Sequence, residues 1–187
     1  MTDDIHPLTA GVRLRPAVLG DAASFAQALT RSRAFMRPWE PVRPESYYTP
    51  EGQAQRLAGL LADRDAGRAM PWVLADEEDR VVGAMTLASI ERGAFRNARL
   101  GYWVDVGRAG QGLATAAVGR VCEAARDTLG LHRIEAGTVV DNAASQRVLA
   151  KSGFERVGTA PRYLHINGAW ADHHLFQRIL HDGPPQR

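Results

Sequence analysis

The residues of this chain best suited to binding a ligand form a short glycine-rich turn. Gly107, Gly110 and Gly112 fall within six residues, between an apolar segment, 100–106, and a segment with apolar residues at helical spacing, 113–129. The first N–H groups of a helix lack partners within the helix, and the helix dipole is positive at that end. Glycines let a ligand approach those groups closely. The turn is therefore either a site for phosphate or pyrophosphate, or a plain strand-to-helix connection.

Two common phosphate-binding motifs do not match this turn. A P-loop needs Lys followed by Ser or Thr after its glycines, and no Lys stands beside these glycines. A dinucleotide-binding fingerprint needs a third small residue where this chain has Thr115, and it usually lies in the first strand–helix unit rather than past mid-chain. Both nucleotide hydrolysis and dinucleotide binding are therefore disfavoured.

The stretch Gly110–Thr115, preceded by Gly101–Val104, resembles the acetyl-CoA motif of the GNAT N-acetyltransferase superfamily, Gln/Arg-x-x-Gly-x-Gly/Ala. Gly112 and Ala114 match its last two fixed positions, whereas Ala109 stands where the pattern has Gln or Arg. The resemblance implies that N–H groups of the turn hold the CoA pyrophosphate and that the preceding strand pairs with the pantetheine arm. The residues it assigns to acetyl-CoA here are Tyr102, Trp103, Val104, Val106, Gly110, Gln111, Gly112, Leu113, Ala114 and Thr115.

A second motif follows, in which Asn142 and Ser145 precede Gly153-Phe154. By itself this pattern describes a short helix with Asn142 as its N-cap and Gly153 as its stop. It also resembles the second CoA motif of the superfamily. That resemblance implies that Asn142 contacts the pantetheine arm or orders the strand end, and that Ser145 lies near the thioester sulfur.

The segment 163–174 contains Asn167-Gly168, a strong hairpin signal between two β-rich runs. It resembles the C-terminal hairpin of the RimJ/RimL-type ribosomal-protein N-acetyltransferases, and the resemblance extends over about 11–180. It implies acetyl transfer to the N-terminal α-amine of a protein or peptide. Relatives of that type also modify small amines, so a small-molecule amine such as an antibiotic is the alternative acceptor.

Amide formation from a thioester needs a proton acceptor for the incoming amine and a proton donor for the leaving thiolate. We predict Ser145 as the donor because it lies on the first turn of a helix, near positive potential; the competing interpretation is a serine that only supports the cap. The candidates for the base are Glu91, Asp105, His165, His173 and His174. We favour His165, for its intrinsic pKa, and Glu91, which lies next to a central strand. His173 and His174 alternate along a strand, so only one of them can face inward.

A loop with three prolines lies between two expected helices, 22–31 and 50–66. It carries Trp39 and Tyr48, which we predict to line the acceptor pocket. Such aromatic residues could equally attach the loop to the core. Asp21 and Thr49 are the expected N-caps of the two helices.

The remaining elements define the fold class. Apolar runs predict strands at 12–16, 71–76, 80–87, 95–106 and 133–140, followed by the two strands of the C-terminal hairpin, and helices at 22–31, 50–66, 113–129 and 142–152. The strand–helix–strand unit 95–140 should make its two strands parallel. We therefore predict an α/β (α+β) GNAT-like fold with a mixed, mostly antiparallel sheet of about six to seven strands and about four helices.

Length and composition indicate one domain over 1–187. The resemblance implies that it is an N-acetyltransferase domain with its core at 11–180, and we expect 181–187 to be a flexible tail. Hydrophobic residues make up 45% of the 187 residues, and the net charge of +2 is too small to argue for a nucleic-acid partner. The single cysteine, Cys122, lies on an apolar helix stripe and is expected in the core. No segment resembles a membrane span, so we expect a cytoplasmic protein, monomeric or homodimeric.

We predict an enzyme that moves the acetyl group of acetyl-CoA, without a metal, to a primary amine. The first acceptor is a protein or peptide N-terminus, and the alternative within the enzyme class is a small amine. A non-catalytic acyl-CoA-binding sensor on the same fold is the alternative from another class. Such a sensor would keep Gly110, Gly112 and Asn142 but would need no acceptor pocket.

Overall fold

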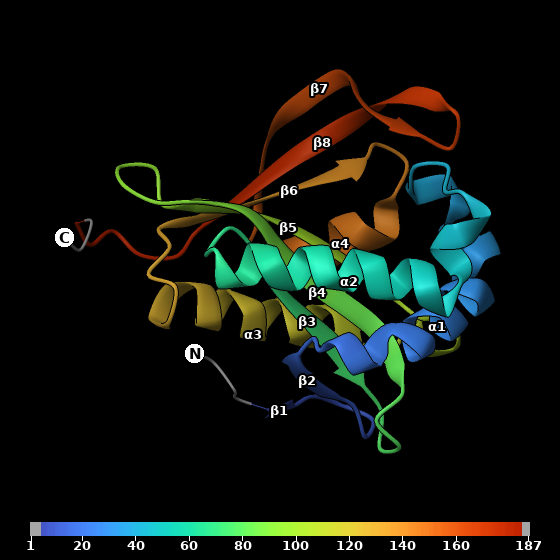
Figure 1. Ribbon diagram of the computed structural model, residues 1–187. Coiled ribbons are helices and arrows are strands. Elements are labelled where there is room, and N and C mark those ends of the chain that lie inside the picture. The colour runs from blue at the N-terminus through green and yellow to red at the C-terminus, as the bar shows by residue number, and fades with distance from the viewer. Residues whose placement is uncertain (1–4, 185–187) are drawn as a thin grey trace.

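The computed structural model of the protein describes residues 5–184, which form one eight-stranded sheet and four α-helices (Figure 1). The helices are α1 (Ala22–Met36), α2 (Pro50–Asp65), α3 (Leu113–Asp127) and α4 (Ala143–Lys151). The strands are β1 (His6–Pro7), β2 (Arg13–Pro16), β3 (Met70–Ala75), β4 (Val81–Glu91), β5 (Asn97–Val104), β6 (Arg133–Val139), β7 (Glu155–Ile166) and β8 (Ala169–Ile179).

The sheet order is β1-β2-β3-β4-β5-β6-β8-β7, and every neighbouring pair except β5 and β6 is antiparallel. The predicted mixed sheet and its parallel pair are therefore confirmed. The structure has one strand more than expected because the two-residue β1 pairs with the start of β2. So short a strand leaves no pattern in the sequence.

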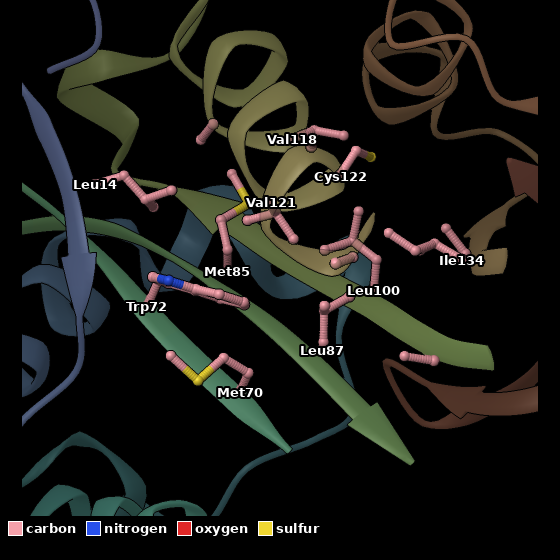
Figure 2. Packing of buried hydrophobic residues seen from close by; sticks show 14 of the residues in the cluster. Leu14, Met70, Trp72, Met85, Leu87, Leu100, Val118, Val121, Cys122 and Ile134 are labelled. Carbon is pink, nitrogen blue, oxygen red and sulfur yellow. The ribbon is translucent and has the colours of Figure 1, made fainter. Parts of the chain in front are cut away.

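Alternating side chains of the central strands divide the core into two layers. Val73 on β3 packs with Phe25 of α1 and Leu57 of α2 on one face of the sheet. On the other face, Trp72 and its neighbours pack against α3 (Figure 2). Figure 2 shows Val118, Val121 and Cys122 on α3, facing Met85 and Leu100 of the sheet. Cys122 is 2% exposed, which confirms the prediction of a core residue, and burial raises the pKa of its thiol.

The first helix begins at Ala22 as predicted, but it differs from its prediction in its end and in the role of Asp21. It continues to Met36 rather than Arg31, because the next five residues are compatible with a helix and no proline occurs before Pro38. Asp21 does not cap it, so that prediction is wrong. Its side chain instead accepts a hydrogen bond from the Val18 N–H at 2.9 Å and pairs with Arg15 at 2.7 Å.

Other predicted helix and hairpin signals are confirmed. Thr49 caps α2 by accepting a hydrogen bond from the Gly52 N–H at 3.1 Å. Asn142 caps α4 in the same way through the N–H of Ser145, also at 3.1 Å. Asn167 and Gly168 have φ angles of 46° and 86°, as a tight hairpin turn between β7 and β8 requires.

The sheet opens between β5 and β6. Their ladder covers only three residue pairs and ends at Arg99 and Glu135, so the second half of β5 has no strand beside it on that side. The β4–β5 ladder, in contrast, continues to Val104. This divergence leaves backbone groups of β5 free to pair with something other than protein.

The chain ends beyond β8. The carbonyl of His181 lies 2.6 Å from Nδ1 of His132, and residues 182–184 form no helix or strand. The rest of the flexible tail that the sequence predicts, 185–187, lies outside the described residues. No helix among residues 5–184 has the length and apolar character needed to cross a membrane.

Candidate active site

A cavity of about 680 Å³ opens at the divergence of β5 and β6. Its wall combines β4, β5, the glycine-rich turn, the first turn of α3, α4 and the loop between α1 and α2. On β5 it is formed by the consecutive residues Gly101–Val104, which include the part of the strand that β6 does not pair. Two motifs from separate parts of the sequence therefore meet at one cavity.

The glycine-rich turn presents open backbone to the cavity. Gly110 and Gly112 have φ angles of 77° and 78°, a left-handed conformation that favours glycine. A Cβ added to either residue would meet no heavy atom within 4 Å, so the space beside both is open. Gly112 is the N-cap residue of α3, and Leu113–Thr115 continue the cavity wall along the first helical turn. The first N–H groups of α3 have no partner within the helix and form its positive end, which suits an anion.

The turn is fixed to the protein body from behind. Asp105 is 4% exposed and accepts hydrogen bonds from the Gly107 N–H at 2.9 Å and from Arg31 at 2.8 Å. The buried Ser32 hydroxyl accepts from the Val106 N–H at 3.1 Å. These contacts tie the turn to α1. The carboxylate of Asp105 is occupied in them, so its role in the structure is to position the turn.

Three cationic side chains line the cavity together with the turn and α4. Arg108 comes from the turn, and Arg147 and Lys151 lie one helical turn apart on α4. A dinucleotide-like or diphosphate ligand carries several negative charges, so three cations and a helix N-terminus complement it.

Ser145 and Tyr102 form a hydrogen-bonded pair on the cavity wall. The Tyr102 hydroxyl lies 2.7 Å from Oγ of Ser145 and also donates to the Ser145 carbonyl at 3.2 Å. Burial raises the pKa of Tyr102 to about 12. The phenol therefore keeps its proton at neutral pH. The pair can donate a hydrogen bond or a proton to a group that enters the cavity beside α4.

The loop between α1 and α2 closes the opposite end. It contains two short 3₁₀ turns, Arg37–Trp39 and Glu45–Tyr48, rather than the irregular chain that its prolines suggest. Its residues on the cavity wall, with Arg56 from α2, are Trp39, Glu40, Arg43 and Tyr47. Glu40 carries the only carboxylate among the described residues that line the cavity.

The family model described as an acetyltransferase (GNAT) domain matches residues 12–155. The chain belongs to the GNAT acetyltransferase family. Members of this family are acetyl-group transferases, and the cavity lies where the two GNAT motifs recognised in the sequence meet.

Relatives extend the match over most of the chain. The GNAT chain is 34% identical over 168 residues to the ribosomal protein uS5-alanine N-acetyltransferase of Escherichia coli K12, covering 89% of this chain and 87% of that protein. The structure of the ribosomal-protein-S5-alanine acetyltransferase from Vibrio fischeri matches with a TM-score of 0.92 and 34% identity, over 97% and 100% of the two chains. Mycobacterium smegmatis RimJ, solved in complex with CoA-disulfide, matches with a TM-score of 0.89 and 34% identity, over 95% and 88%.

Most residues that the sequence assigned to acetyl-CoA lie on this GNAT cavity. They are Tyr102, Trp103, Val104, Gly110, Gly112, Leu113, Ala114, Thr115, Asn142 and Ser145. Val106 and Gln111 are exposed and stand outside the lining. The Gln111 amide instead donates to the Gly107 carbonyl at 3.3 Å, back within the turn.

The two favoured candidates for the base lie elsewhere. Glu91 is exposed at the end of β4, and His165 is exposed on β7 with its ring against Trp170, 5.5 Å between centroids. Neither is among the described residues that line the GNAT cavity, so both remain predictions without geometric support. His173 is 3% exposed and its Nδ1 lies 3.0 Å from the Ala171 carbonyl. His174 lies beside Thr159 at 2.9 Å.

The predicted acceptor residues divide between two places. Trp39 lines the GNAT cavity, whereas Tyr48 lies behind it, against Arg33 and a shallow hollow between α1 and α2. The sequence reasoning missed Glu40, Arg43 and Arg56 altogether. A usable signal was present, because Glu40 stands between Trp39 and Pro41 in a loop stiffened by prolines.

Proposed function

We propose that this GNAT protein transfers the acetyl group of acetyl-CoA to the α-amine at the N-terminus of a protein or peptide. The observation that carries the proposal is the cavity where the open edge of β5, the glycine-rich turn and the Ser145–Tyr102 pair meet. Relatives at 34% identity, which cover nearly all of the chain, are named for acetylating alanine on a ribosomal protein. Those names support a protein N-terminus as the acceptor.

The residues present fit acetyl-CoA. Open backbone at Gly110 and Gly112, with three cations around it, suits a diphosphate. The unpaired edge of β5 suits the two amides of a pantetheine arm, which can pair with a strand much as another strand would. A relative at 34% identity was solved with a CoA-disulfide, which supports the same co-substrate here. We propose that Asn142 orders the end of the arm beside α4.

The reaction forms a bond between the amine nitrogen and the acetyl carbonyl carbon and breaks the bond from that carbon to sulfur. The amine loses a proton, and the leaving thiolate gains a proton or a hydrogen bond. We propose that Ser145, backed by the protonated Tyr102, supplies the latter. We propose that a backbone N–H group within Gly101–Trp103, which line the cavity, donates to the carbonyl oxygen as it gains negative charge. Holding both partners in one cavity supplies much of the remaining rate.

The sensor alternative lacks a supporting observation. A protein that only binds acyl-CoA has no use for a second cavity end with a carboxylate and two guanidinium groups, which this chain has. The cytoplasmic location predicted from the sequence is part of our proposal.

A mass-spectrometric screen tests the function. The protein is incubated with acetyl-CoA and a mixture of short peptides, aminoglycosides and polyamines, and each is examined for a gain of one acetyl group. We expect peptides beginning with alanine or serine to be modified. Modification of small amines alone would show that the acceptor is a small-molecule amine and not a peptide N-terminus. Tight acetyl-CoA binding without any product would favour the sensor.

A further inference from the structure

The loop between α1 and α2 brings to the cavity charged side chains that have no role in the proposed binding of acetyl-CoA. Glu40, Arg43 and Arg56 line the cavity, far along the chain from the cations beside the glycine-rich turn. The Glu40 side chain is 13% exposed and the Arg43 side chain 36%. Charged groups are rarely buried without a purpose, because removing them from water is unfavourable.

These groups satisfy one another only in part. Nε of Arg43 lies 4.0 Å from Oε2 of Glu40, the outer limit of an ion pair. That Nε is buried and makes no hydrogen bond within the described part of the chain. Arg56 donates through its Nε to the Gln53 side chain at 3.1 Å, and its guanidinium lies over the rings of Phe25 and Tyr47. Arg56 is also one of the residues that line the cavity.

The loop is also held in place, as a binding site requires. The Glu40 carbonyl accepts a hydrogen bond from the Asn167 N–H at 3.0 Å, and Arg37 donates to the Asn167 side chain at 3.3 Å. At the other end of the loop, Arg33 pairs with Glu45 at 2.9 Å. The tip of the β7–β8 hairpin thus fixes the backbone of Glu40 independently of its carboxylate.

We propose that Glu40 receives the ammonium group of the acceptor and takes its proton, while Arg43 and Arg56 bind the carbonyl oxygen beside that amine. The acceptor class is therefore an α-amino acyl group, as at a peptide N-terminus, in which amine and carbonyl share one carbon. This inference rests on the proposed function and names the residues that select its substrate. A polyamine has no carbonyl oxygen to accept a hydrogen bond from Arg43. Its positive charges are also repelled by both guanidinium groups.

The electrostatics agree with a base. Burial raises the pKa of Glu40, whereas Arg43, a hydrogen bond from Tyr48 and the charge of Arg33 act in the opposite direction. Those three groups, from the loop, the second 3₁₀ turn and α1, are the charged and titratable neighbours that face it. A free α-amine has a pKa of about 8, lower than that of a lysine, so its proton passes to a carboxylate at a smaller energetic cost.

A binding cycle tests Glu40 without turnover. A peptide beginning with alanine and its analogue with propionyl in place of alanyl, which lacks only the amine, are titrated calorimetrically into the protein with CoA. We expect wild type to prefer the amine by at least about tenfold, and Glu40→Gln to reduce that ratio to about one. The matched control is Glu51→Gln at the start of α2, which is exposed and outside the cavity lining and should keep the wild-type ratio.

Kinetics supply the second readout. Glu40→Gln should lower kcat/KM for the peptide by about 10²-fold and move the acidic limb of its pH profile up toward the pKa of the free α-amine, about 8, with the Kd of acetyl-CoA within about twofold. Unchanged CoA binding shows that the variant is folded, and Glu40→Asp should recover part of the rate. If wild type acetylates the peptide and Glu40→Gln keeps both the amine preference and the wild-type pH profile, the inference is wrong and the proposed function stands. If wild type neither prefers the amine nor acetylates the peptide, both are wrong.

The carbonyl is tested with a matched acceptor in which a trans-alkene replaces the first peptide bond, so that the carbonyl is lost and no second basic amine is added. Wild type should prefer the carbonyl form by at least about tenfold in kcat/KM. Arg43→Met should reduce that preference at least about threefold, because only Arg56 then remains to bind the carbonyl, while Arg64→Met, on α2 outside the cavity lining and paired with Asp65, should keep it. Equal preference in wild type and Arg43→Met would contradict the assignment of Arg43.

Discussion

The hydroxyl oxygens of Tyr102 and Ser145 lie 2.7 Å apart and link β5 to α4 across one wall of the cavity. Each residue comes from a different GNAT motif. Tyr102 lies on the strand whose edge is open, and Ser145 lies one turn into the helix that Asn142 caps. We propose that this contact lets the two hydroxyl groups act together as one proton donor.

Removing either hydroxyl should therefore have nearly the effect of removing both. We expect Ser145→Ala and Tyr102→Phe each to lower kcat with a peptide acceptor by about 10–10²-fold, with the Kd of acetyl-CoA within about threefold. The double variant should be less impaired than the product of the two single effects. Tyr163→Phe, on β7 against His173, is the control and should keep the wild-type rate. Wild-type turnover by Ser145→Ala would remove it from the mechanism.

The pKa of Tyr102 sets the alkaline behaviour. Burial raises it to about 12, from an ordinary value near 10. We therefore expect no fall in kcat between pH 8 and 10 from loss of this proton. Folding favours the neutral phenol, so the stability it contributes is complete below pH 10 and is lost as the pH rises toward 12. Denaturant unfolding over that range should show a smaller loss in Tyr102→Phe than in wild type.

The contribution of the glycine-rich turn to CoA binding can be measured separately from the effect of backbone strain on stability. Gly112→Ala places a side chain at a φ of 78° and into open space beside the helix N-terminus. It should destabilise the protein by about 1–2 kcal/mol and raise the Kd of acetyl-CoA by at least about tenfold. Gly67→Ala is the matched control, with a φ of 71°, equally open space and a position after α2 away from the cavity. Equal CoA affinity in the two variants would contradict the diphosphate site.

Ionised Glu40 should also lower the stability of the folded protein. Because burial raises its pKa, folding favours the protonated carboxyl, and the ionised form destabilises the protein as pH rises above about 4. Glu40→Gln should then raise Tm at pH 7 by about 1–3 °C relative to wild type. The difference should shrink toward pH 4, where wild type becomes neutral. A lower Tm for the variant at pH 7 would show that the carboxylate stabilises the fold instead.

The elements around the two motifs could be predicted because local signals and the final structure agree. Thr49, Asn142 and Asn167-Gly168 end or begin their elements through contacts only a few residues away. Asp21 misled because its carboxylate has other partners, the Val18 N–H and the Arg15 guanidinium, which precede it in the chain by three and six residues. The two-residue β1 depends wholly on pairing with β2, which no local pattern reports.

The candidate site also could be predicted only where its residues are close together in the sequence. The residues proposed for acetyl-CoA form contiguous motifs, whereas the acceptor side brings a loop and α2 together through packing. Glu91 and His165 have suitable chemistry, but the ends of β4 and β7 carry them to the surface. Glu40 reaches the cavity because Asn167, 127 positions later, holds its backbone. Contacts at that separation become visible only with the fold.

The central claim is transfer of acetyl to an α-amine, and one regiochemical measurement tests it most directly. A peptide with an N-terminal alanine and an internal lysine is incubated with acetyl-CoA and the protein, and the product is sequenced by tandem mass spectrometry. We predict one acetyl group on the alanine nitrogen and none when the N-terminus is blocked. Acetylation of the lysine alone, or of the blocked peptide at the same rate, would contradict the account.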